Sequence, residues 1–444
     1  MQLLPSVFLL PLLFNGCIGL DHRAVPSDAT IPPSQDPWYT APSDFESASP
    51  GTILRFRTDP SNLTAIVAAA AAYNILFRST DTHYQPSWAV TTLLVPEHPL
   101  ETRNVSNNNV AGNGKPALLS FQIPYNAASV DGGPSYLLAT NFGLSGAGVT
   151  PQTSYIADML SRGWYVVVPD FEGPTAAFGA GPQAGHAVLD NIRAALSSEA
   201  LSANSENTRY AMWGYSGGSI ASTFAAELQA AYAPELNFAG AALGGIVPDL
   251  TEVFRKPISN VSAAIPAGLL GVTAQYPSAR EFLISQLETS GPYNAAGFLQ
   301  ALNFNAVQSI EYFGLQNISE YFVNGLEAIY EAPELARVFG DNEYEGYHGI
   351  PQMPLFVYKA IHDDSNGIAT SDDLITHYCK VGANILYHRN TIGGHEDEII
   401  NGLSRAFEFL SAVLNGSYAE KYNATGCTWV DITVNVTASA TDKS

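Results

Sequence analysis

Five residues, Gly214-Tyr215-Ser216-Gly217-Gly218, form a Gly-x-Ser-x-Gly pentapeptide that follows a strand-like run, Thr208–Trp213, and precedes a helix-like segment, Ser219–Ala231. A serine on such a sharp strand-to-helix turn needs small residues two positions before and after it, because the backbone is strained and neighbouring elements pack closely. Ser216 is therefore predicted to be a nucleophile at the carboxyl edge of a sheet. The N–H of Gly217 is predicted to donate to an oxyanion on an attacked carbonyl. The pattern predicts a serine hydrolase.

A serine nucleophile of this kind needs an acid and a histidine, which follow it along the chain in that order. Asp363 comes just after a strand-like run, Leu355–Ala360, and His395 follows a pair of glycines after a further strand-like run, Asn384–Arg389. We expect His395 to take the Ser216 proton as general base and to return it to the leaving alcohol. We expect Asp363 to hold the imidazole tautomer and to stabilise the imidazolium.

Two alternatives remain open for these roles. Asp364 adjoins Asp363, and pattern alone does not separate two acids at a strand end. His362 could be the base, but it precedes the acid and lacks the loop after a further strand. No histidine belongs to an H-E-x-x-H or comparable spacing of metal ligands, so we expect no metal and no cofactor.

The composition limits the class of partner. The chain has 444 residues, of which 46% are hydrophobic, and can bury a large core. Its 41 acidic residues against 19 basic ones give a formal net charge of -22, which argues against nucleic acid and anionic membranes. After the N-terminus we find no apolar run of about 18 residues, and we expect no transmembrane segment. A small-molecule ester is the expected partner.

The N-terminus resembles a secretory signal peptide over residues 1–19, although it lacks the usual basic residue; a buried N-terminal strand or helix is the alternative. Cleavage there would remove Cys17 and leave Cys379 and Cys427, which predicts one disulfide that ties the C-terminal tail to the domain. We therefore expect entry into the secretory pathway and an extracellular location. Seven sequons are candidate glycosylation sites: Asn62, Asn104, Asn260, Asn317, Asn415, Asn423 and Asn435.

The order of the elements predicts an α/β fold with a mostly parallel central sheet flanked by helices, because continuous apolar strands alternate with helix-like segments. After a proline-rich arm at 25–50, the first part of the core is expected at 20–248 and the second at 349–444. Residues 249–348 show helical spacing and many aromatics, and we expect a helical cap that covers Ser216. The strand-like runs are Ala72–Arg78, Trp88–Val95, Ala117–Phe121, Trp164–Pro169, Thr208–Trp213, Phe238–Leu243, Leu355–Ala360 and Asn384–Arg389.

A second oxyanion donor is expected from the loop after the run Ala117–Phe121. Asn126 is the best-placed donor in that loop. A purely structural turn role for Asn126 explains the sequence nearly as well.

Beside the pentapeptide, the chain contains Asp36-Pro37-Trp38-Tyr39, Pro50-Gly51-Thr52, Ser120-Phe121-Gln122-Ile123-Pro124-Tyr125, Pro169-Asp170-Phe171-Glu172-Gly173-Pro174, Leu189-Asp190-Asn191-Ile192-Arg193, Gly244-Gly245 and His377-Tyr378-Cys379. In these segments it resembles the fungal secretory lipases, a branch of the α/β-hydrolase superfamily that includes the Candida lipases. The resemblance implies the α/β-hydrolase fold, a lid formed by the helical insertion, and triad roles for Ser216, Asp363 and His395.

Two departures from the family touch the site. Asn126 stands where the family usually has an aspartate, and Asp131-Gly132-Gly133-Pro134 stands where the family has a cysteine. Length and tail resemble members that deacetylate a sesquiterpene toxin, so we expect a serine carboxylic-ester hydrolase that removes an acetyl group from a small fungal metabolite, as in trichothecene C-3 deacetylation. A secreted triacylglycerol lipase is the main alternative, and a non-catalytic binding protein with a hydrolase fold is a remote one.

Overall fold

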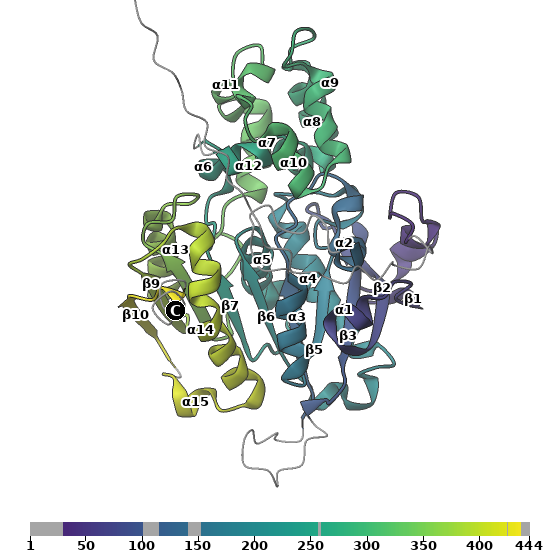
Figure 1. The fold of residues 1–444 in the computed structure, drawn as a ribbon, viewed down its shortest axis with the longest axis vertical. Helices are drawn as coiled ribbons and strands as arrows, with labels where there is room; N and C mark the ends of the chain where they lie inside the picture. Colours follow the sequence, from purple (N-terminus) through teal and green to yellow (C-terminus); the bar gives the residue numbers. More distant parts are fainter. Residues whose placement is uncertain (1–29, 101–114, 141–151, 256–258, 424, 437–444) are drawn as a thin grey trace, which may run out of the picture.

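The computed structural model describes residues 30–100, 115–140, 152–255, 259–423 and 425–436. The expected signal peptide, residues 1–19, and the sequon at Asn104 lie outside these ranges. Figure 1 shows a sheet with helices on both faces and a group of helices above one end of it.

The sheet has ten strands in the order β1-β2-β3-β5-β4-β6-β7-β8-β9-β10. Neighbours from β5 to β10 are parallel, whereas β1/β2, β2/β3 and β3/β5 are antiparallel. The mostly parallel sheet predicted from the sequence is therefore confirmed. The strands are β1 Ile53–Thr58, β2 Ala69–Thr80, β3 Pro86–Pro96, β4 Ala117–Gln122, β5 Tyr165–Pro169, β6 Arg209–Tyr215, β7 Gly240–Gly244, β8 Leu355–Ala360, β9 Ile385–Asn390 and β10 Cys427–Ile432.

The inner strands are mostly apolar because helices cover both of their faces. Every residue of β4, β5, β7 and β8 is buried. Eight strand-like runs correspond to β2 through β9, but the sequence interpretation missed β1 and β10. These two lie at the edges of the sheet and are only partly buried, so they lack the apolar run that marks the inner strands.

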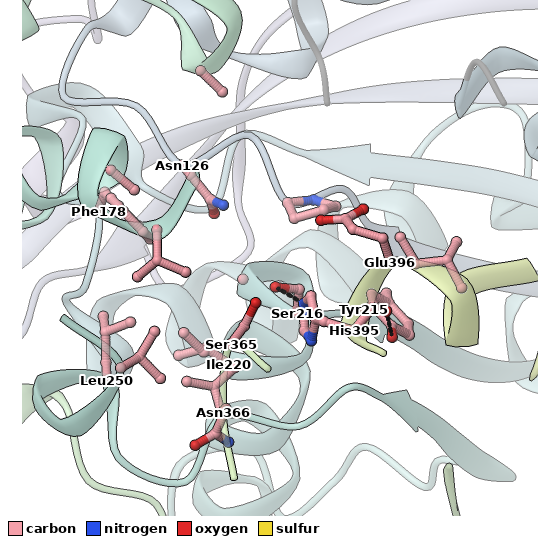
Figure 2. Close-up of a pocket in the computed structure, with 18 of the residues that line it drawn as sticks. Asn126, Phe178, Tyr215, Ser216, Ile220, Leu250, Ser365, Asn366, His395 and Glu396 are labelled. Atoms are coloured by element: carbon pink, nitrogen blue, oxygen red, sulfur yellow. Dashed lines mark hydrogen bonds between the residues drawn. The ribbon is translucent and has the colours of Figure 1, made fainter. Parts of the chain in front are cut away.

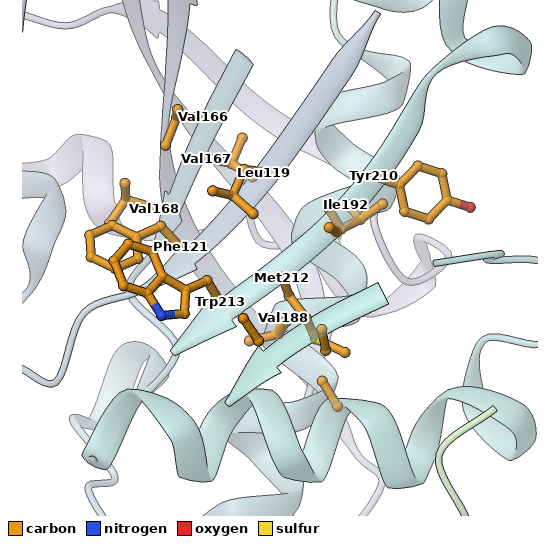
Figure 3. Close-up of a cluster of buried hydrophobic side chains, with 14 of the residues drawn as sticks. Leu119, Phe121, Val166, Val167, Val168, Val188, Ile192, Tyr210, Met212 and Trp213 are labelled. Carbon is orange, nitrogen blue, oxygen red and sulfur yellow. The ribbon is translucent and has the colours of Figure 1, made fainter. Parts of the chain in front are cut away.

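Adjacent residues of β6 point to opposite faces and mark the two helical layers. Trp213 packs against Tyr155 of α3 (Gln152–Ser161) and Phe407 of α14 (His395–Asn415). Met212 lies among the side chains of the other face, with Val188 of α4 (Gly181–Ser197) (Figure 3). On that second face α4 packs along α5 (Gly217–Tyr232), and the Tyr378 hydroxyl of α13 (Ile368–Lys380) donates to Glu227 of α5.

Between β7 and β8 the described chain contains only helices and short connections. The helices are α6 Leu250–Phe254, α7 Ser259–Val272, α8 Pro277–Ser285, α9 Ala295–Phe298, α10 Ala306–Phe313, α11 Glu327–Tyr330 and α12 Pro333–Asn342. They share a second hydrophobic core, which includes Phe298, Phe313, Tyr321 and Leu335. Figure 1 shows these helices, in green, above the sheet.

The remaining helices are short: α1 Leu63–Val67, α2 Pro134–Thr140 and α15 Tyr418–Lys421. A disulfide joins Cys379 at the end of α13 to Cys427 at the start of β10, with Cα atoms 5.9 Å apart. This bond ties β10, the edge strand of the sheet, to the end of α13.

Candidate active site

Ser216 lies on the turn between β6 and α5 with a φ of +52°, a conformation that is strained for a residue with a side chain. The two flanking glycines are required by close packing. A Cβ atom on Gly214 would lie 2.1 Å from the Gly218 carbonyl oxygen, and one on Gly218 would lie 2.0 Å from the Gln122 carbonyl oxygen. The turn therefore forms only with glycine at both positions, and it leaves the serine at the carboxyl edge of the sheet.

The structure brings Ser216, His395 and Asp363 together from three separate segments. His395 is the first residue of α14, and its Nε2 lies 2.9 Å from the Ser216 Oγ (Figure 2). Its Nδ1 lies 2.8 Å from Oδ2 of Asp363, which follows β8. Both His395 and Asp363 are buried, so water does not compete for these contacts.

The two alternatives from the sequence occupy different places. Asp364 is exposed, and its Oδ1 accepts a 3.2 Å hydrogen bond from the backbone N–H of His395 rather than from the ring. A carboxylate beside the N-terminus of a helix also complements the dipole of α14. His362 is exposed as well, and the imidazole that contacts Ser216 is that of His395.

Asp363 is held in its ionised form by its neighbours. Burial alone would raise the pKa of this carboxyl, but the charge and hydrogen bond of His395, followed by the Lys359 ammonium, hold the pKa well below its usual range. Oδ1 accepts from the backbone N–H groups of Ser365, at 3.0 Å, and Asn366, at 2.8 Å. Such backbone bonds stabilise the charged form of a carboxylate.

Two polar neighbours of the triad were missed by the sequence interpretation. The Lys359 Nζ donates to Asp363 Oδ2 at 2.8 Å, and the Tyr215 hydroxyl donates to the carbonyl oxygen of His395 at 2.5 Å. Lys359 lies inside an apolar strand-like run, where a charged residue is unexpected, and this was the available signal. Tyr215 occupies the second position of the pentapeptide, which can hold any residue, so the sequence did not indicate a role for it.

Asn126 and Gly217 meet beside Ser216. A Cβ atom on Gly217 would lie 2.1 Å from the Asn126 Oδ1, so the amide closely covers the first turn of α5. Asn126 has a φ of +41°, and its buried Oδ1 has no hydrogen-bond partner among the described residues. A half-turn about the Cβ–Cγ bond would direct the amide N–H groups to the same place.

A pocket opens over Ser216 and is lined mainly by apolar side chains. The helices between β7 and β8 contribute mostly small and aliphatic residues to it. Phe254 lines the pocket and also belongs to the second core, whereas Phe313 and Tyr321 belong to that core alone. The aliphatic and small lining residues from these helices are Leu250, Val253, Val261, Ala263, Ala264, Ala306 and Ile310. Polar side chains are scattered among them: Asn126, Gln152, Ser309, Ser365, Asn366 and Glu396.

The described sequons differ in exposure. Asn62, Asn317 and Asn423 are exposed, and Asn415 and Asn435 are half-buried. The side chain of Asn260 lies outside the described part of the structure. None of the helices in the described ranges is long and apolar enough to cross a membrane, and no three potential metal-ligating side chains cluster there.

Comparison with known proteins identifies the family. The family model for secretory lipases matches residues 140–421. The chain is 43% identical over 432 residues to trichothecene C-3 esterase of Fusarium sporotrichioides, which covers 96% of this chain and 93% of that protein. It is 41% identical over 415 residues to probable trichothecene esterase SAT6 of Stachybotrys chartarum, covering 91% of this chain and 81% of that protein. The solved structure of Candida antarctica lipase A superposes with a TM-score of 0.76 at 26% identity, covering 91% of this chain and 90% of that one. The chain therefore belongs to the secretory lipase family and is a carboxylic ester hydrolase of the α/β-hydrolase fold.

Proposed function

We propose that this esterase removes a short acyl group, in the first place acetyl, from a small oxygenated metabolite, with Ser216, His395 and Asp363 as the catalytic residues. The observation that carries the proposal is the chain of contacts from Ser216 Oγ through the His395 ring to the Asp363 carboxylate, at the base of an apolar pocket. Nucleophile, base and orienting acid are thus in hydrogen-bond contact before any substrate arrives.

In the proposed reaction, Ser216 Oγ attacks the ester carbonyl carbon while His395 Nε2 takes the hydroxyl proton. The tetrahedral intermediate then collapses, the ester C–O bond breaks, and His395 gives the proton to the leaving alcohol. Water next attacks the acyl carbon while His395 takes a proton from it. The acyl–Oγ bond then breaks, His395 returns the proton to Ser216 Oγ, and the carboxylic acid is released. The negative charge of Asp363 keeps the Nδ1 proton on the ring and stabilises the imidazolium in both steps.

The oxyanion of both intermediates would be held beside the first turn of α5. We propose the backbone N–H of Gly217 and the amide of Asn126 as the two donors, since the two residues meet next to Ser216. An asparagine amide donates without needing a proton of its own, so this oxyanion site should not depend on acidic pH. Replacing Asn126 with alanine should lower kcat by about 10²–10³-fold.

The pocket chemistry supports a compact, oxygenated alcohol more than a long fatty acyl chain. Its apolar wall can cover a rigid terpenoid skeleton, while the scattered amide, hydroxyl and carboxyl side chains can bind ring oxygens. The relatives named as trichothecene esterases support C-3 deacetylation of a trichothecene as the specific reaction. A triacylglycerol lipase is the second candidate, because the family name and Candida antarctica lipase A favour it.

We also propose that residues 249–348 form a cap over the core segments 20–248 and 349–444. Helices α6, α7 and α10 supply one side of the pocket, which supports this division.

Export to the cell exterior, with removal of residues 1–19 and glycans on the sequons, is proposed as well. The Cys379–Cys427 disulfide and the exposure of Asn62, Asn317 and Asn423 support it.

The test is hydrolysis of a matched ester series, from acetyl to palmitoyl, together with an acetylated trichothecene. Purified protein is compared with Ser216→Ala, which should fold normally and lose nearly all activity. Preference for acetyl esters, and for the trichothecene above all, is the expected result. Rates that rise with chain length and at an oil–water interface would assign the enzyme to the lipases instead. Failure of an organophosphonate to label Ser216 would indicate a non-catalytic binding protein.

A further inference from the structure

A buried lysine lies at the centre of the polar network behind His395. The Lys359 side chain, near the end of β8, has no exposed surface. Its Nζ donates to Asp363 Oδ2 at 2.8 Å and to the Ile246 carbonyl oxygen at 3.0 Å. The same Oδ2 atom lies 2.8 Å from His395 Nδ1. The Oδ2 atom of Asp363 therefore contacts both the positively charged Lys359 ammonium and the imidazole of His395.

Stability alone is a weak reason for a buried ion pair in this position. Taking an ammonium and a carboxylate out of water is costly, and well-packed apolar residues often stabilise a fold as well or better. The neighbouring residues of β8, such as Phe356 and Val357, are apolar and fully packed. Lysine at 359 is thus better explained by what its charge does to Asp363 and His395.

The hydrogen bonds of Lys359 also fix the loop that carries Asp363. The Asn366 side chain donates to the same Ile246 carbonyl at 2.7 Å, and the Asn366 backbone N–H bonds to Asp363 Oδ1. Ile246 directly precedes Val247, which lines the pocket. Lys359 and Asn366 together hold the acid loop against the segment that leads out of β7, so the carboxylate has one orientation.

The groups around the imidazole are mostly acidic. The loop after β8 contributes Asp363 and Asp364, and α14 contributes Glu396, Asp397, Glu398 and Arg405. Two tyrosines, Tyr215 of β6 and Tyr358 of β8, also lie in this region. Glu345 lies near Lys359, and Glu227 lies beyond Glu345. Arg405 forms an ion pair with Glu398, 2.7 Å apart. Burial, and then the nearby Glu227, raise the pKa of the Glu345 carboxyl well above its usual value, so Asp363 is the ionised partner of Lys359.

We propose that Lys359 is a positioning residue of the esterase, which orients the Asp363 carboxylate and places a positive charge beside the acid–histidine pair, so that the enzyme remains active in mildly acidic medium. This inference rests on the proposed triad. A positive charge beside the pair opposes a second positive charge on the imidazole, and only a neutral imidazole can accept the Ser216 proton.

The size of the effect follows from the geometry. Nζ of Lys359 and Nδ1 of His395 are each 2.8 Å from the same oxygen, so they are at most twice that distance apart. At an effective dielectric constant near 20, removing a unit charge at no more than this distance is equivalent to about 2–3 pH units. The acidic limb of the kcat/KM profile, where activity falls as the pH is lowered, should therefore move to higher pH by that amount.

The experiment compares pH profiles of kcat/KM for acetyl-ester hydrolysis in the wild type, Lys359→Met, Lys359→Gln and Lys359→Arg. Glutamine keeps uncharged N–H donors on a side chain of the same length as methionine, so comparing the two neutral variants separates charge from hydrogen bonding. We expect the acidic limb to lie at higher pH in both neutral variants and at the wild-type pH in the arginine variant. Val357→Ala, in the same strand, is the control for lost packing, and should leave the limb in place.

An unchanged acidic limb in a folded neutral variant overturns the proposal. So does a uniform loss of kcat at every pH, or failure of both neutral variants to fold while Val357→Ala folds, because either result would mean that Lys359 is purely structural. If the wild type itself hydrolyses no ester, the proposed function fails instead. The two failures are therefore distinguishable in one set of measurements.

Discussion

Replacing Asp363 with asparagine removes the negative charge that faces His395 but keeps the size of the side chain. The new Oδ1 can still accept from the backbone N–H groups of Ser365 and Asn366. The new amide N–H group, however, would take the place of Oδ2: it would donate to His395 Nδ1 and could no longer accept from Lys359 Nζ. That donation stabilises the tautomer with its proton on Nε2, which cannot accept the proton of Ser216. A wrong tautomer with intact geometry lowers kcat by about 10⁴-fold, or roughly 5 kcal/mol of transition-state stabilisation.

Asp364→Asn is the matched control, because it makes the same chemical change one residue away. Asp364 contacts the backbone N–H of His395 and not the ring, and an asparagine oxygen can keep that bond. The lost charge at the start of α14 should change kcat/KM by no more than about fivefold.

The assay is kcat/KM for p-nitrophenyl acetate at neutral pH, with circular dichroism to verify folding. Asp363→Asn within tenfold of the wild type would refute the assignment, as would an equal loss in Asp364→Asn.

Three further predictions concern the scaffold. Gly218→Ala places a methyl group 2.0 Å from the Gln122 carbonyl oxygen, so it should destabilise the protein by about 1–3 kcal/mol or prevent folding; a melting temperature equal to that of the wild type would contradict the packing argument. Cys427→Ser opens a covalent loop with a sequence separation of 48 and should cost about 4 kcal/mol in urea unfolding, whereas an unchanged midpoint would show that the link to Cys379 adds nothing. Burial raises the pKa of Glu343 to about 8 from 4.5, so this group favours the folded state at low pH and the stabilisation is lost as pH rises from about 4.5 to 8. Glu343→Gln should accordingly reduce the fall in melting temperature across that range, and an identical fall in the variant would count against it.

Local sequence determined the elements that form the scaffold. The pentapeptide around Ser216 predicts a tight turn because only glycine fits where the backbone of β4 and the first turn of α5 approach it, and this is a short-range steric requirement. The strands β2 through β9 were predicted because burial favours apolar and β-branched residues, which are continuous in several of these strands. The strands β1 and β10 were not predicted, because an edge strand is only partly buried and lacks a long apolar run.

Tertiary structure alone decided how the polar groups of the site are paired. Asp363 and Asp364 are chemically alike and adjacent in sequence, but the turn after β8 directs one carboxylate to the His395 ring and the other to its backbone N–H. In the sequence, Lys359 is an unexplained charge within an apolar strand. The structure explains it, because its Nζ donates to Asp363 Oδ2, the oxygen that also contacts His395. Hydrogen bonds depend on direction and on separations of a few tenths of an ångström. These are fixed only when segments that lie far apart along the chain have packed together.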